Sequence, residues 1–245
     1  LSKTLARGVR SVCSSVSTPQ RNQFREEAPS ETSGVRDASR AALSPKLGMR
    51  HKSRRRYATQ RIEMGTYGRS FPDRIRAFKA DFPAPPDAVL RPESEEQIEQ
   101  ILEWAAANEV KVYPFGGGSS VVSGFEPDPD DERVIFLDME RFDRVLEVDT
   151  QSRAARIQAG IYGPALEREL KQHGLTMRHF PQSFEFSTLG GWIATRSGGH
   201  YATNHTRIDD FVESARMLTP SGPWESRRLP GSGAGPSPDR MVLGS

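Results

Sequence analysis

The sequence contains a single cysteine, Cys13, among its 245 residues. A disulfide framework and a cysteine-based zinc or iron–sulfur site both need several cysteines, so both are excluded. No run approaches the roughly 18 apolar residues that a transmembrane helix requires, and no membrane span is predicted. His200 and His205 are five residues apart, which misses the same-face spacing of helical metal ligands. No metal site is therefore predicted.

Acidic residues are absent from the first 25 positions. Residues 1–60 carry 13 basic and 4 acidic side chains, a net charge of +9, whereas residues 61–245 carry a net charge of −7. Such asymmetry is typical of a charged tail attached to a globular part. We predict a disordered basic tail, or upstream sequence, over residues 1–64 and a folded domain over 65–245. The Arg- and Ser-rich start also resembles an organellar transit peptide. No nucleic-acid partner is expected, because the tail supplies the positive charge.

The folded part mixes strands and helices without a regular alternation, which favours an α+β fold. Its clearest helix begins at the N-cap Ser94 with Gln97 three residues later, a capping-box pattern, and ends near Asn108. We expect two α+β lobes, at about 80–160 and 161–245, with their boundary near Gly160. The apolar stripe of the helix is expected to contain Ile98, Ile101, Leu102, Ala105 and Ala106. The other expected elements are strands at 88–92, 110–115, 134–138, 212–218 and 241–245, a hairpin of 144–149 with 153–159, and a helix at 165–173.

A glycine loop directly follows the strand expected at 110–115. Three successive glycines lack Cβ atoms, so neighbouring backbone N–H groups can turn toward one anion, and two serines add hydroxyl donors. The loop has neither the G-x-G-x-x-G pattern of a Rossmann fold nor the Lys-Ser/Thr pair of a P-loop. We interpret it as a phosphate-binding loop rather than an ordinary turn. Its residues are Pro114, Phe115, Gly116, Gly117, Gly118, Ser119 and Ser120.

A second group of small, hydroxylated and aromatic residues lies between positions 182 and 200. Gly190 and Gly191 would let a flat ligand approach the backbone, with Trp192 and Phe186 as walls. Arg196 offers a planar fork of donors to a phosphate or an electron-rich ring. The alternative is a tight corner between loop and helix, with Trp192 in the core. The candidate ligand-binding residues are Gln182, Ser183, Phe184, Glu185, Phe186, Ser187 and Thr188, followed by Thr195, Arg196, Ser197 and Gly198.

Taken together, the segments 114–120, 182–188 and 195–198 resemble the FAD-binding domain of the PCMH type, named for p-cresol methylhydroxylase and shared with vanillyl-alcohol oxidase. Within that superfamily, residues from about 69 to 245 are most similar to the alkyldihydroxyacetonephosphate synthase family and to bacterial FAD-linked oxidases. The resemblance implies that 114–120 wraps the FAD pyrophosphate. The other two segments would line the rest of the dinucleotide and approach the isoalloxazine ring. Gly117→Val is expected to abolish flavin binding by filling the pyrophosphate space.

The resemblance also implies a reaction. In that family the fatty-acyl group of acyl-dihydroxyacetone phosphate is exchanged for a fatty alcohol on the flavin, a step of ether-lipid biosynthesis. Two alternatives remain open: an FAD-linked oxidase or dehydrogenase of 2-hydroxy acids or phenols, and a catalytically incompetent flavin-binding fragment. We expect a chain truncated before its substrate domain, so that a small-molecule or lipid substrate binds only with that domain. A homodimer is compatible with the family. A bacterial member would be cytoplasmic, and a eukaryotic one peroxisomal or in another organelle.

The sequence has two further features that can belong to binding sites. The sequence around His200 echoes the motif by which some relatives attach flavin covalently through histidine, but there the histidine lies in the first glycine loop, which here has none. We therefore predict non-covalent FAD. The acidic run 126–132 lacks the spacing of a calcium loop and is predicted to be solvated.

Overall fold

A computed structural model of the chain describes residues 9–12, 70–79, 81, 85–122, 124, 126–128, 130–201, 207–226 and 242–244. The predicted tail over 1–64 lies outside these residues, apart from one strand at Val9–Val12 that the sequence did not suggest. In chain order the elements are β1 (Val9–Val12), α3 (Phe71–Phe78), β2 (Ala88–Leu90), α4 (Glu95–Ala107), β3 (Lys111–Phe115), β4 (Val134–Asp138), β5 (Val145–Asp149), β6 (Ala154–Gln158), α5 (Gly163–Gln172), the 3-10 turn η1 (Phe184–Phe186), α6 (Leu189–Ala194), α7 (Ile208–Phe211), β7 (Val212–Thr219) and β8 (Gly222–Glu225).

The smaller sheet has the order β2-β4-β3 and is parallel throughout. The helix α4 connects β2 with β3, the two edge strands, which lie parallel to each other on either side of β4. Ser94 is its N-cap, accepting from the N–H of Gln97, and Asn108 is its C-cap, so both predicted ends are confirmed. The predicted apolar stripe is buried except at Ala106, which is exposed.

The larger sheet has the order β5-β6-β1-β7-β8. The strands β5 and β6 form the predicted antiparallel hairpin, and β1 lies parallel between β6 and β7. The chain therefore passes between the sheets at 139–144, ahead of the boundary predicted near Gly160. The boundary lies earlier than predicted because β6 pairs with β1, which places the whole hairpin of β5 and β6 in the larger sheet. Gly160 instead packs against the connection 139–144, where an added Cβ would lie 1.9 Å from the carbonyl oxygen of Met139.

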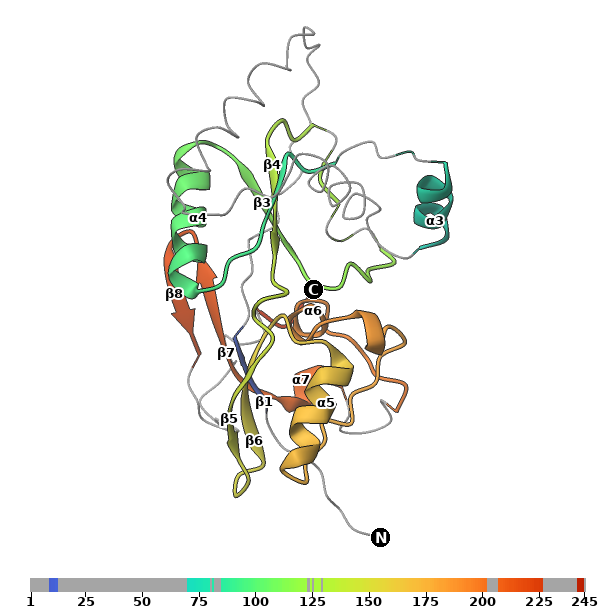
Figure 1. Ribbon diagram of the computed structural model, residues 1–245, viewed down its shortest axis with the longest axis vertical. Helices are drawn as coiled ribbons and strands as arrows, with labels where there is room; N and C mark the ends of the chain where they lie inside the picture. The colour runs from blue at the N-terminus through green and yellow to red at the C-terminus, as the bar shows by residue number, and fades with distance from the viewer. Residues whose placement is uncertain are drawn as a thin grey trace, which may run out of the picture.

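The two sheets are joined through β7 (Figure 1). Its Arg216 donates to Glu95 at the start of α4 over 2.6 Å, and its Leu218 is buried in the core of the smaller sheet. The sequence suggested no strand at β8, which pairs with β7 across the turn after Thr219. The strand expected at 241–245 is not formed in the described part, because Val242–Gly244 make a turn whose apolar side chains are buried.

Among the described residues, no helix has the length and apolar character needed to cross a membrane. The helix α6 lies between the two sheets in Figure 1, and α3 stands to one side of them. The core of the larger sheet surrounds α5 and α6, whereas the second core surrounds α4. This arrangement brings the carboxyl end of β3 toward α6.

Candidate cofactor-binding site

The glycine loop after β3 packs directly against the turn that precedes α6. A Cβ atom on Gly116 would lie 2.4 Å from Oγ1 of Thr188. A Cβ atom on Gly117 would lie 1.8 Å from the backbone oxygen of Phe186. Because any larger residue would overlap its neighbour at these distances, only glycine allows the two segments to approach so closely. The structure thus brings together two segments that are about 70 positions apart in the sequence.

The same loop presents a row of backbone donors. Gly118 has a φ of +60°, in the left-handed region that glycine adopts without strain, and the ring of Phe115 lies where its Cβ would point. Within the described part of the chain, the N–H groups of residues 116–120 donate to no protein acceptor. Successive free N–H groups around a left-handed residue are the donor set that binds phosphate oxygens. This donor set fits a pyrophosphate.

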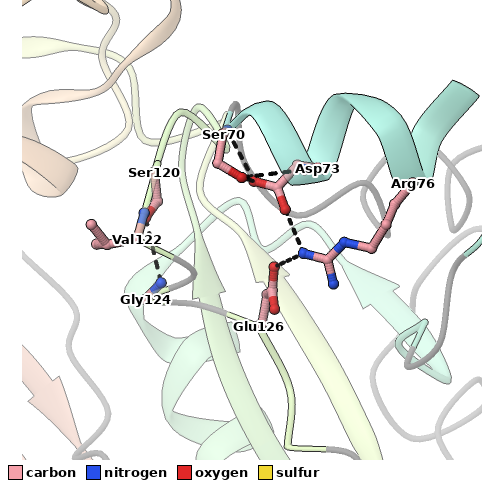
Figure 2. Close-up of polar contacts among 7 residues, drawn as sticks. All are labelled: Ser70, Asp73, Arg76, Ser120, Val122, Gly124 and Glu126. Carbon is pink, nitrogen blue, oxygen red and sulfur yellow. Dashed lines mark hydrogen bonds and ion pairs between the residues drawn. The ribbon is translucent and has the colours of Figure 1, made fainter.

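The first residues of the predicted phosphate-binding loop belong to a strand, and its last residue forms hydrogen bonds with the residues that follow. Pro114 and Phe115 belong to β3, the edge strand of the smaller sheet, where a proline is tolerated. Ser119 lies next in the loop, half-buried. Ser120 Oγ accepts from the N–H groups of Val122 and Gly124 over 3.3 and 3.4 Å, which folds the next residues into a turn (Figure 2). Among the described residues, the hydroxyl of Ser120 donates to no acceptor, so its proton can bind a ligand oxygen.

The turn at 182–188 combines anchoring and exposed side chains. Ser187 is buried, donates to the carbonyl oxygen of Ser183 over 2.7 Å and accepts from Nε1 of Trp192 over 2.6 Å. Phe184 stacks on Trp192, with ring centroids 6.1 Å apart. Trp192 is only 2% exposed and belongs to the core, so the interpretation of it as a ligand wall is wrong. The exposed members of the segment are Gln182, Glu185 and Phe186, the last with 53% of its surface exposed.

The helix α6 connects the second and third segments. Thr188 is its N-cap, accepting from the N–H of Gly191, and Thr195 is its C-cap, donating to the oxygen of Gly191 over 2.8 Å. Gly190 is buried, and its Cβ would lie 2.8 Å from the Cβ of Ala159. The absence of a side chain at Gly190 therefore lets α6 pack closely against Ala159, directly after β6, rather than letting a ligand approach as the sequence suggested. Gly191 is exposed.

The predicted donor fork of Arg196 is already engaged within the protein. Its backbone has a φ of +52°, and its Nε and one terminal nitrogen donate to Oδ2 of Asp209 over 3.2 and 3.1 Å. The other carboxylate oxygen of Asp209 is buried and has no hydrogen-bond partner among the described residues, although Nε of Arg207 lies 3.8 Å from it. Gly198, the last residue of the segment, is exposed and forms a β-bridge with Arg207. Asp209 was not among the predicted site residues.

His179 was also not among the predicted site residues, and its side chain holds the third segment, residues 195–198, in place through Ser197. It is fully buried, and its Nε2 is hydrogen-bonded to Oγ of Ser197 over 2.8 Å. Its ring lies 5.2 Å from that of Trp192 and 6.3 Å from that of Phe211, measured between centroids. The sequence around His179 gives no sign of this role, because the partner is 18 residues away.

His200, by contrast, is exposed and close to the backbone oxygen of Phe180, which lies 3.0 Å from its Nδ1. Over the described ranges, no cluster of three or more His, Cys, Asp or Glu side chains could hold a metal ion. The site therefore offers neutral backbone and hydroxyl donors near the glycine loop, an exposed aromatic ring at Phe186, and one arginine. These groups suit a bound dinucleotide.

Comparison with known proteins bears on that fit. The sequence model of the FAD binding domain family matches residues 86–226. The chain is 41% identical over 180 residues to alkyldihydroxyacetonephosphate synthase of Dictyostelium discoideum, covering 74% of this chain and 30% of that protein. It is 31% identical over 134 residues to D-lactate dehydrogenase of Archaeoglobus fulgidus, covering 55% of this chain and 29% of that protein.

The fold shows the same similarity. A solved structure of alkyldihydroxyacetonephosphate synthase superimposes with a TM-score of 0.74 at 34% identity, covering 89% of this chain and 38% of the other. The chain thus spans about a third of the length of these relatives.

Proposed function

This chain belongs to the FAD binding domain family, and we propose that it holds FAD non-covalently along residues 114–120, 182–188 and 195–198. FAD is the cofactor of the family, and the fold is that of the PCMH-type domain. Two observations carry the proposed position: the glycine loop contacts the turn before α6, and five neighbouring N–H groups of the loop have no acceptor among the described residues. The flavin supplies the redox or transfer chemistry when it is bound.

The residues of this chain would bind and orient that cofactor. The N–H groups of 116–120 and the hydroxyl of Ser120 would hold the pyrophosphate, since small backbone donors fit closely around its oxygens. Phe186 would contact a flat ring through its exposed face. Ser187 and Thr188 are buried, so they support the binding segment from within the protein. Arg196 would contribute positive charge near the cofactor while Asp209 fixes its orientation.

For the reaction, we propose exchange of a fatty-acyl group for a fatty alcohol on dihydroxyacetone phosphate. Identity of 41% to a synthase of that name supports it, as does the structural similarity. Oxidation of a 2-hydroxy acid is the second candidate, favoured by the similarity to D-lactate dehydrogenase.

FAD-loaded protein should incorporate labelled fatty alcohol into lipid phosphate and should not reduce a dye with D-lactate. Dye reduction without incorporation would favour the second candidate. Absence of both activities would favour a fragment that only binds FAD.

Cofactor binding is tested separately from turnover. Titration of the purified chain with FAD should quench flavin fluorescence at one equivalent and raise the melting temperature, because a ligand that binds only the folded state stabilises it. After acid precipitation, the flavin should remain in the supernatant. Flavin in the pellet would contradict non-covalent binding, and absence of both quenching and stabilisation would contradict the proposal as a whole.

A further inference from the structure

The connection between β3 and β4 starts with the glycine loop and continues over residues 116–133. The described residues of this connection form no helix or strand, and long connections of that kind are uncommon in compact domains and often functional. The side chains of Val121 and Val122, directly after the glycine loop, are 62% and 79% exposed and do not hold this part of the connection by apolar burial. Polar contacts therefore help to fix the path of the segment that carries the proposed phosphate ligands.

One such contact comes from the helix α3. A terminal nitrogen of Arg76 donates to Oε1 of Glu126 over 2.8 Å and also to Oδ1 of Asp73 (Figure 2). Arg76 thus connects the helix with the far side of the turn that Ser120 begins. The sequence prediction that the acidic run 126–132 is solvated is wrong at Glu126, which is half-buried and paired. It is also wrong at Asp131, which accepts from the hydroxyl of Tyr113 over 2.6 Å.

The helix itself is organised around that contact. Ser70 donates through its N–H to Asp73 over 3.0 Å, and the N–H of Asp73 donates back to Oγ of Ser70 over 3.2 Å, a reciprocal capping box. Burial alone would raise the pKa of Asp73, but hydrogen bonds from Ser70 and Arg76 outweigh it and hold the pKa below its usual value. Asp73 is therefore charged at neutral pH and orients the guanidinium of Arg76. The apolar side chains of Phe71 and Phe78 are exposed, so they do not attach the helix.

We propose that Arg76 is a positioning residue for the phosphate-binding loop. By holding Glu126, it fixes the connection that follows the glycines before FAD arrives. The inference rests on the proposed function, and it goes beyond it because α3 lies ahead of residues 86–226, the part that matches the family. A loop that is ordered in advance removes an entropic cost from binding. Ordering even one additional residue on binding costs about tenfold in affinity.

The test uses the 245-residue chain with the variants Arg76→Met, Arg76→Lys, Glu126→Gln and the double variant Arg76→Met/Glu126→Gln. The dissociation constant for FAD is measured by fluorescence quenching, and amide exchange is followed in the FAD-free protein. Arg133→Met is the matched control, because its pair with the exposed Glu109 lies at the other end of the same connection.

Arg76→Met and Glu126→Gln should each weaken FAD binding by about tenfold, and the double variant should be no weaker than either. Arg76→Lys should restore part of the affinity. Exchange should accelerate at Val122 and Gly124 while α4 and β4 stay protected, a pattern that general destabilisation would not give. Wild-type affinity in Arg76→Met, additive losses, or an equal effect of Arg133→Met would overturn the inference. If the unchanged protein bound no FAD, the proposed function would fail instead.

Discussion

The backbone oxygen of Phe186 occupies the place that a Cβ atom on Gly117 would need, at a distance of 1.8 Å. The contact joins the glycine loop to the turn before α6 and thereby assembles the candidate site. It also changes the reason for expecting Gly117→Val to abolish flavin binding. The side chain would first displace the backbone of the neighbouring segment, rather than fill the space of the pyrophosphate.

Even the smallest substitution at this position should therefore be damaging. Gly117→Ala is expected to cost about 1–3 kcal/mol of folding free energy, the usual scale of overpacking, and to weaken FAD binding with it. Urea unfolding provides the measurement. Gly191→Ala is the control, because its Cβ would lie 3.4 Å from Oγ1 of Thr188 and the residue is exposed on α6. Equal stabilities of the two variants would contradict the contact.

The hydrogen bond between His179 and Ser197 should contribute measurably to stability. Ser197→Ala removes the hydroxyl that Nε2 of the buried His179 meets, and loss of a buried hydrogen-bond partner costs about 1–2 kcal/mol. In a double-mutant cycle with His179→Phe, the two losses should not add. Ser221→Ala, in the exposed turn before β8, should leave unfolding unchanged. Full additivity in the cycle would show that the two side chains are not coupled.

The ion pair of Arg196 with Asp209 should have a smaller effect, because both side chains are partly exposed and solvent screens the charges. Asp209→Asn is expected to cost about 1 kcal/mol. Chemical unfolding should distinguish it from Asp210→Asn, which changes the adjacent and exposed carboxylate. The assignment is contradicted if the two variants unfold alike.

The phenol of Tyr113 should ionise at a higher pH than the phenol of an exposed tyrosine. Burial, together with the hydrogen bond to Asp131, raises its pKa to about 12. Because the pKa is raised in the folded state, the contribution of the neutral phenol to stability is complete below about pH 10 and is lost as the pH rises through about 12. Near-ultraviolet titration of the protein and of Tyr113→Phe should differ by one tyrosinate in that upper range. A difference centred near pH 10 would contradict the burial.

The elements of the smaller lobe could be predicted from the sequence because their signals are local. Ser94, Gln97 and Asn108 lie at the ends of α4 as their side-chain chemistry indicates. The helix α3 carries an equally local signal, Ser70 three residues before Asp73, but it lacks a buried apolar stripe and so was missed. The strand β1 offers no such pattern, since its place in the sheet depends on parallel pairing with β6 and β7.

The segments of the candidate site could be predicted from the sequence, but the residues that hold those segments in place could not. The three glycines indicated an anion-binding loop by their lack of side chains. Their packing against residues 186–188 depends on contacts across about 70 positions, which composition does not reveal. His179 and Asp209 are ordinary residues in sequence, and only tertiary contact gives them a role. Trp192 could be assigned to the core or to a ligand wall until its burial was known.

The most direct test of the account is amide hydrogen exchange of the chain with and without saturating FAD. We predict that FAD slows exchange at residues 116–120, whose N–H groups donate to no protein acceptor among the described residues, with smaller protection at 182–188 and 195–198. FAD binding that leaves residues 116–120 unprotected, or protects only other segments, would contradict the assignment of the glycine loop as the pyrophosphate site.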